Sequence, residues 1–149
     1  MNVLAYDPYK PASEFPDGVE VVRDLDRIFK ECDYVSLHCP LTPATRHLIN
    51  ADTLVLMKPT AFLINTSRGA LIDEPALIKA LQEHKIAGAG LDVQETEPPV
   101  EDNPLYTLDN VILTPHMGWK GLETRQRLLS ILKGNIDGFI NGKPVNVVS

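Results

Sequence analysis

The sequence has no apolar run long enough to cross a membrane and no cluster of basic residues. A membrane-spanning helix needs about 20 successive apolar residues, and the 149 residues contain no such run. The formal net charge is −6, whereas a nucleic-acid-binding face needs clustered Lys and Arg. These absences argue against a membrane protein and against a nucleic-acid-binding protein.

Cysteine is also scarce. Cys32 and Cys39 are the only two, and they do not form a C-x-x-C pair, so neither a disulfide framework nor a redox motif is indicated. Free thiols fit a reducing compartment, and residues 1–10 lack the charged start and apolar middle of a signal peptide. We therefore expect a cytoplasmic protein. The histidines lack the spacing of metal ligands, so no metal is expected.

Short apolar runs alternate with amphipathic stretches along the chain. The runs predict strands at 2–6, 19–22, 34–38, 60–65, 86–93 and 110–115. Apolar spacing with N-capping Asp24, Asn50 and Asp73 predicts helices at 24–32, 50–58 and 73–85, and a long fourth helix at 121–142. This alternation is typical of an α/β fold with a doubly wound parallel sheet.

A doubly wound sheet raises the question of dinucleotide binding, but the expected glycine loop is not there. The only G-x-G, at 88–90, lies inside a predicted strand, whereas a phosphate loop connects a strand to a helix. Asp7, in contrast, follows the first predicted strand. An acidic residue at the end of the second strand of a dinucleotide fold binds the ribose hydroxyls, and Asp7 could be that residue. Asp7 could equally open an ordinary Asp-Pro turn with Pro8, and both readings stay open.

If Asp7 marks the second strand of a dinucleotide fold, the first strand, glycine loop and first helix are lacking. In the strand order 3-2-1-4-5-6 the lacking strand is central, and each buried backbone group left unpaired costs about 1–3 kcal/mol. We therefore expect either truncation from a longer chain or pairing of the exposed strand edges with another copy.

Three residues of different chemistry follow successive predicted strands. Arg68 can hold a carboxylate with its planar guanidinium, His116 can exchange a proton near neutral pH, and Glu97 can orient the imidazole. Each of them also has a simpler interpretation when taken singly: Arg68 as a surface charge, His116 as a structural histidine and Glu97 as a solvated acid. Their joint placement at one sheet edge indicates reduction of a 2-oxo acid, with Arg68 on the carboxylate and His116 as the proton donor.

The sequence also resembles a known family over most of residues 3–142. The matching stretches are YDPY, DYVSLHCPLTPATRHLIN, LMKPTAFLINTSRGALIDEPALIKAL, AGAGLDVQETEPP, NPLYTLDNVILTPHMGW and ETRQRL. They are similar to the nicotinamide-binding domain of the D-isomer-specific 2-hydroxyacid dehydrogenases, which has a Rossmann-like fold. HMGW and ETRQRL look most like the glycerate dehydrogenase/hydroxypyruvate reductase members.

The resemblance implies a set of site residues and a cofactor. Arg68, Glu97 and His116 match the catalytic arginine, glutamate and histidine, and Glu97 is preferred to Glu95 because the family's acid follows the aspartate of LDV by five residues. The implied cofactor contacts are Asp7, His38, Cys39, Pro40, Thr66, Asp92 and Gly118. Asp7 favours NAD over NADP, because a carboxylate repels a 2′-phosphate. The implied substrate is a small 2-keto or 2-hydroxy acid.

The departures from the family set further expectations. Residues 1–142 would form a partial dinucleotide-binding domain, and 143–149 would return to a substrate domain that is not in the sequence. The apolar face of the helix at 121–142 would be left exposed, which favours a homodimer. Without a phosphate loop we expect weak cofactor binding and little turnover. A nicotinamide-sensing corepressor module and an inert fragment remain alternatives.

Overall fold

The computed structural model describes residues 1–148, which divide into one compact unit of residues 1–116 and a second unit that begins at Met117. The strands of the first unit are β1 (Val3–Tyr6), β2 (Val19–Val22), β3 (Tyr34–Leu37), β4 (Phe62–Asn65), β5 (Gly88–Leu91) and β6 (Val111–Leu113). Its α-helices are α1 (Leu25–Glu31), α2 (Ala51–Leu54) and α3 (Glu74–Gln82), joined by 3-10 turns at Ala12–Glu14, Gly69–Leu71 and Pro104–Thr107. Every predicted strand and helix is present, with α2 shorter than expected.

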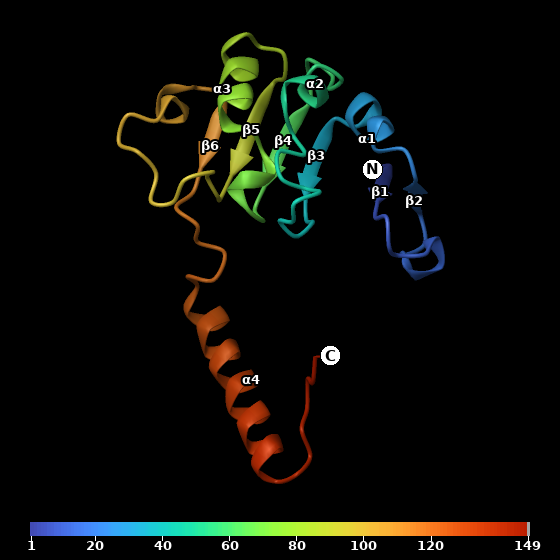
Figure 1. Ribbon diagram of the computed structural model, residues 1–149, viewed down its shortest axis with the longest axis vertical. Helices are drawn as coiled ribbons and strands as arrows, with labels where there is room; N and C mark the ends of the chain where they lie inside the picture. Colours follow the sequence, from blue (N-terminus) through green and yellow to red (C-terminus); the bar gives the residue numbers. More distant parts are fainter. Residues whose placement is uncertain (149) are drawn as a thin grey trace. The chain divides into compact units, whose positions relative to one another are not determined.

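All strand pairs are parallel, which confirms the predicted α/β class, but the strands form two sheets (Figure 1). One sheet pairs β1 with β2, and the other has the order β3-β4-β5-β6. The order predicted from a doubly wound fold puts one central strand between β1 and β3. The division of the sheet falls at that position.

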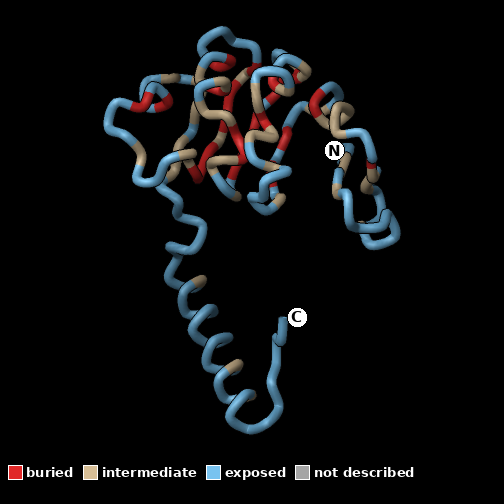
Figure 2. The backbone as a smooth tube through the Cα atoms, viewed as in Figure 1, coloured by how far each residue is buried: buried red, intermediate tan, exposed pale blue. Residues whose placement is uncertain are grey.

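The core lies on one face of the four-stranded sheet. Alternate residues of β3 and β4 point into it, and they pack with the inner sides of α1, α2 and α3 around Phe29, Leu54, Leu77 and Leu81. Figure 2 shows the buried segments gathered in this part of the chain. Burial of large aliphatic side chains stabilises such a core by about 1.5–3 kcal/mol each.

The other face of the same strands differs from the sequence prediction. The apolar run at 60–65 predicts a strand covered on both sides, yet Phe62 is 38% exposed and its β3 neighbour Tyr34 is 66% exposed. The two rings stack with centroids 5.6 Å apart. Within residues 1–116, the helices pack into the core on the opposite face, and this aromatic pair stays partly exposed.

The helix starts were correctly predicted from their capping residues. The side chain of Asp24 accepts from the amide of Asp26, Asn50 forms a capping box with Thr53, and Asp73 accepts from the amide of Ala76. Each cap satisfies amides that have no partner within the helix.

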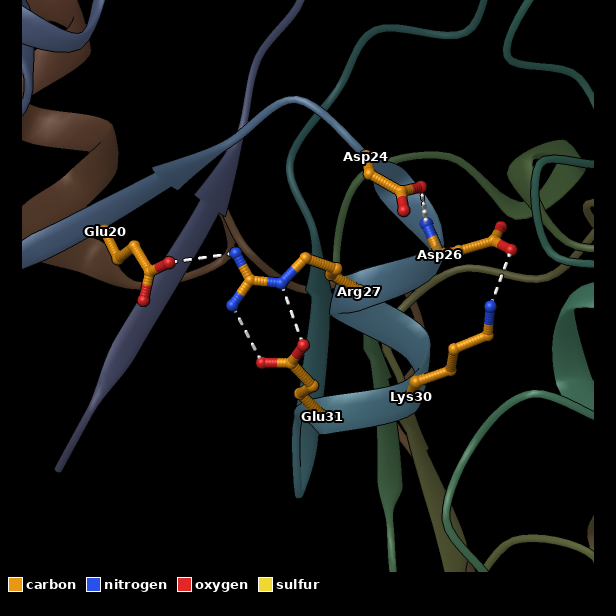
Figure 3. A network of polar contacts seen from close by, with 6 residues as sticks. All are labelled: Glu20, Asp24, Asp26, Arg27, Lys30 and Glu31. Carbon is orange, nitrogen blue, oxygen red and sulfur yellow. Dashed lines mark hydrogen bonds and ion pairs between the residues drawn. The ribbon is translucent and has the colours of Figure 1, made fainter.

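A polar network on α1 ties this helix to β2, as Figure 3 shows. Arg27 donates to both carboxylate oxygens of Glu31 at 2.8 and 2.9 Å and to Glu20 of β2 at 2.9 Å. Lys30 pairs with Asp26 one turn away. Of these exposed contacts, the one between Arg27 and Glu20 links α1 to the small sheet, and all of them lie outside the core.

The second unit contains α4 (Leu122–Ile140), and no residue of this helix is buried. Its exposed apolar side chains include Leu128, Leu129, Leu132, Ile136 and Phe139. The segment after the helix folds back on it, because the amide of Lys143 bonds to Gly138 and the side chain of Asn146 bonds to Asn135. The predicted return segment 143–149 ends at Ser149, which lies outside the described residues. In the part of the chain that the structure describes, no helix has the length and apolarity needed to span a membrane.

Candidate active site

The parallel strands β3 to β6 end at one edge, and the predicted site residues follow them there. Residues 38–40 follow β3, residues 66–68 follow β4, residues 92–97 follow β5, and His116 comes shortly after β6. In open α/β sheets, ligands bind outside the carboxyl ends of the strands. Local chain geometry then decides which side chains reach the same space.

The turn that carries Arg68 is built around a buried asparagine. Asn65, with 0% exposure, accepts from the amide of Ser67 and donates to the carbonyl of Arg68. The Ser67 hydroxyl donates to the carbonyl of Leu37 at 2.7 Å, which ties this turn to the end of β3. Arg68 itself is exposed and gives one N–H to the carbonyl of Ser67. The guanidinium is therefore held through its terminal Nη1 atom, and it has four further N–H donors on Nε, Nη1 and Nη2.

Glu97 and His116 are paired directly. Nδ1 of His116 lies 2.7 Å from Oε2 of Glu97, and the other carboxylate oxygen accepts from the amide of Gln94. The hydrogen bond from His116 lowers the pKa of Glu97 below its usual range, and the positive charge of Arg68 acts in the same direction. The carboxylate therefore stays ionised at neutral pH and holds the imidazole through Nδ1, so that Nε2 is the ring nitrogen not engaged by Glu97.

The backbone at His116 is unusual. Its φ is +48°, in the left-handed region that few residues other than glycine adopt, although histidine is among the more tolerant. Strained backbone of this kind is concentrated at functional sites. In this conformation the imidazole contacts Glu97.

Arg68, Glu97 and His116 line one cleft of about 280 Å³. Its other lining residues are Leu41, Gly69, Ala70, Val93, Gln94 and Glu95. The cleft thus brings a guanidinium, a carboxylate and an imidazole to one small space, which is wide enough for a short organic acid.

A second cleft, of about 480 Å³, adjoins the first, since Arg68 and Leu41 line both. His38, Cys39, Pro40 and Ser67 complete it. Burial raises the pKa of the Cys39 thiol, so this side chain is a neutral part of the wall at physiological pH. The Nε2 atom of His38 lies 2.8 Å from the Ser36 hydroxyl.

The remaining predicted cofactor residues are placed differently. Asp92 is buried beneath the edge and accepts a hydrogen bond from the Thr114 hydroxyl, whereas Thr66 is exposed and outside the lining of both clefts. Asp7 accepts from the amides of Tyr9 and Lys10 at 2.8 and 3.0 Å, which are the bonds of an Asp-Pro turn. Gly118 belongs to the second unit.

Several residues around the site were not anticipated from the sequence. Gly69 allows the backbone of Gln94 to approach so closely that a Cβ at this position would lie 1.9 Å from the carbonyl oxygen. Glu95, set aside in favour of Glu97, lines the cleft and is bonded to His47. The glycine after Arg68 was a visible signal, whereas nothing in the sequence links residues 47 and 95. Among residues 1–148 no cluster of His, Cys, Asp or Glu side chains could hold a metal ion.

The pairing of Glu97 with His116 predicts a pH-dependent stability. Because the pKa of Glu97 is lowered in the folded chain, its contribution is present above the unfolded pKa and is lost as the pH falls through the folded pKa. Both side chains are more than a third exposed, so the effect is small. Glu97→Gln should melt below wild type at neutral pH, and the two curves should converge in acid, as measured by circular dichroism. Glu101→Gln, on the exposed loop, is the control, and a constant difference at all pH values would contradict the pairing.

The first unit is thus a parallel α/β domain with a guanidinium and an imidazole–carboxylate pair at the carboxyl edge of its sheet, which is the edge where ligands bind in α/β proteins of this class. Residues 1–118 match the family described as D-isomer specific 2-hydroxyacid dehydrogenase, NAD binding domain. The chain belongs to this family, which confirms the resemblance seen in its motifs.

Named relatives and solved structures agree with this family assignment. The chain is 47% identical over 144 residues to D-3-phosphoglycerate dehydrogenase of Methanocaldococcus jannaschii, covering 96% of this chain and 27% of that protein. It is 44% identical over 149 residues to hydroxypyruvate reductase of Blautia hydrogenotrophica, covering 100% of this chain and 46% of that protein. The NAD-complexed D-isomer specific 2-hydroxyacid dehydrogenase of Lactobacillus delbrueckii ssp. bulgaricus superposes with a TM-score of 0.87 at 33% identity, over 99% of this chain and 48% of that one. The chain thus spans half or less of the length of these proteins.

Proposed function

We propose that this chain carries the substrate-binding and proton-transfer residues of an NAD(H)-dependent D-2-hydroxyacid dehydrogenase. Such an enzyme interconverts a short 2-oxo acid and the corresponding D-2-hydroxy acid. The observation that supports it most is the meeting of Arg68, Glu97 and His116 in one cleft. The relatives named hydroxypyruvate reductase and glyoxylate reductase suggest substrates with a chain of two or three carbons. We also propose that the chain acts as a homodimer, which the exposed apolar side chains of α4 support.

Each of the three residues has a task that follows from its chemistry. Arg68 binds the substrate carboxylate and withdraws charge from the neighbouring carbonyl. The imidazolium of His116 gives the proton of Nε2 to the carbonyl oxygen in reduction and takes it back in oxidation. Glu97 accepts from Nδ1–H, which holds the ring in position. General acid catalysis of this kind contributes about 10²–10⁴-fold in rate.

The second cleft suits a nicotinamide ring beside the oxo acid. Its walls at residues 38–41 are largely uncharged, and Arg68 stands between it and the first cleft. When bound, NADH supplies the hydride. His38, Cys39 and Pro40 would hold the ring side of the cofactor, and Asp7 would hold the adenosine ribose with the carboxylate oxygen that the turn does not use. Because the sequence has no glycine loop between a strand and a helix, we expect weak NADH affinity in this chain.

The test combines binding with turnover. Oxamate, an unreactive analogue of a 2-oxo acid, should shift the amide signals of Arg68, Gln94 and His116 in two-dimensional NMR, with acetamide as a control that lacks the carboxylate. Hydroxypyruvate or glyoxylate should then be reduced slowly at high NADH concentration, as followed by NADH absorbance, with a D-configured product from hydroxypyruvate. A folded chain in which oxamate leaves these signals unmoved would refute the proposal.

A further inference from the structure

Glu95 lies at the centre of a polar cluster that belongs to the wall of the cleft and that the proposed reaction does not use. Its carboxylate accepts from Nε2 of His47 at 2.6 Å, from Nη2 of Arg46 at 3.3 Å and from the amide of Glu74 at 3.3 Å. The side chain is only 22% exposed. A carboxylate with this many donors is held in one position.

The contact between Glu95 and Glu74 is reciprocal. The amide of Glu95 donates to Oε2 of Glu74 at 3.1 Å, while the amide of Glu74 donates to Oε2 of Glu95. The buried side chain of Asn103 links the same two segments, because its Nδ2 donates to Oε1 of Glu74 in α3 and to Oε1 of Gln94 in the loop after β5. The loop after β5 is therefore bonded to the first turn of α3, which is packed into the core.

The same loop connects this anchor to the reacting groups. The amide of Gln94 donates to Oε1 of Glu97 at 3.1 Å, and the other oxygen of Glu97 holds His116. On the opposite side, the amide of His47 bonds to the carbonyl of Ala70, two residues after Arg68. Glu95 thus links the segment that carries Glu97 to the segment that carries Arg68.

The electrostatics agree with an ionised Glu95. Partial burial alone would raise the pKa of its carboxyl, but the hydrogen bonds from His47 and from the Glu74 amide, with the charge of Arg46, outweigh burial and lower the pKa. His47 has a left-handed backbone with φ of +51°, and in this conformation its ring contacts Glu95.

We propose that Glu95 is a positioning residue, which, with His47 and Glu74, sets the separation of Arg68 from the Glu97–His116 pair. This rests on the proposed function, since it assigns a task within the same reaction. Small displacements of reacting groups cost up to about 100-fold in rate. Glu95→Ala should therefore lower kcat by up to about 100-fold and change KM for the oxo acid far less.

A spectroscopic measurement tests the positioning without relying on turnover. In Glu95→Ala, the Glu97 carboxyl, followed by carbon-13 NMR, should titrate at higher pH than in the wild-type chain, because Gln94 and His116 no longer hold it in place. Glu95→Gln keeps an acceptor for the Glu74 amide, so it should lie between the two. Glu101→Ala, on the exposed part of the loop, should leave the titration unchanged.

His47→Asn provides a second route if Glu95→Ala fails to fold. Asparagine tolerates the left-handed backbone but is too short to reach Glu95, so the Glu97 titration should again move upward. An unchanged Glu97 titration in folded Glu95→Ala or, failing that, in His47→Asn would overturn the proposal. If the wild-type chain reduces no oxo acid, the proposed function fails, and the titration still decides whether Glu95 positions Glu97.

Discussion

Replacing His116 by asparagine should lower the rate of NADH-dependent oxo-acid reduction by about 10²–10⁴-fold while oxamate binding persists. Asparagine tolerates the left-handed backbone at this position, so the loop after β6 should keep its path. It cannot exchange a proton near neutral pH, and the carbonyl oxygen would have to take its proton from water. Binding persists because Arg68, which holds the carboxylate, is unchanged. The rate is measured with NADH and hydroxypyruvate in excess, and binding is measured by the oxamate-induced NMR shifts.

His84→Asn is a matched control for this variant. His84 has nearly the same backbone conformation, with φ of +50°, and it lies just after α3, at the end of the sheet away from the cleft. Its replacement should leave the rate within a factor of about two, as expected for surface changes. A His116→Asn chain that retained most of its activity would remove His116 from the chemistry, and a loss of oxamate binding would show that its role is in binding.

Features that depend on local sequence were predictable. Apolar runs bounded by Pro and Gly marked the strands, and Asp24, Asn50 and Asp73 marked the helix starts, because a cap bonds to amides only two or three residues away. The meeting of Arg68, Glu97 and His116 at one edge could also be anticipated, since parallel strands end on the same side.

Features that depend on the packing of distant segments were not predictable. The bond between His47 and Glu95 joins residues 48 positions apart, and no motif links them. The exposure of Phe62 was also missed, because an apolar run shows only that a strand can be covered on both faces. For Asp7, the sequence left a turn and a ribose contact open, and the structure shows the turn bonds without deciding the other role.

Replacing Gly69 by alanine should destabilise the first unit by about 1–3 kcal/mol, which corresponds to a fall in melting temperature of about 4–12 °C. The added Cβ would lie 1.9 Å from the Gln94 carbonyl oxygen, 2.0 Å from its carbon and 2.5 Å from the Glu95 amide nitrogen. These are backbone atoms, so the clash is relieved only if the loop after β5 moves away from the Arg68 turn. The φ of Gly69 is not positive, and the cost is therefore steric. Melting is followed by circular dichroism, and loop movement by the NMR signals of Gln94 and Glu97.

Gly90→Ala is the control that distinguishes this steric clash with backbone atoms from a general effect of replacing a glycine. A Cβ on Gly90 meets only the terminal methyl of Ile64, at 3.2 Å, and a flexible side chain can give way by this amount. Its melting temperature should fall by much less, with the signals of Gln94 and Glu97 unchanged. If Gly69→Ala had the melting temperature of the wild type and left the signals of Gln94 and Glu97 in place, the position of the loop after β5 would not depend on its contact with Gly69. The pairing of β4 with β5 and the Glu95 cluster would then be what holds Arg68 near Glu97.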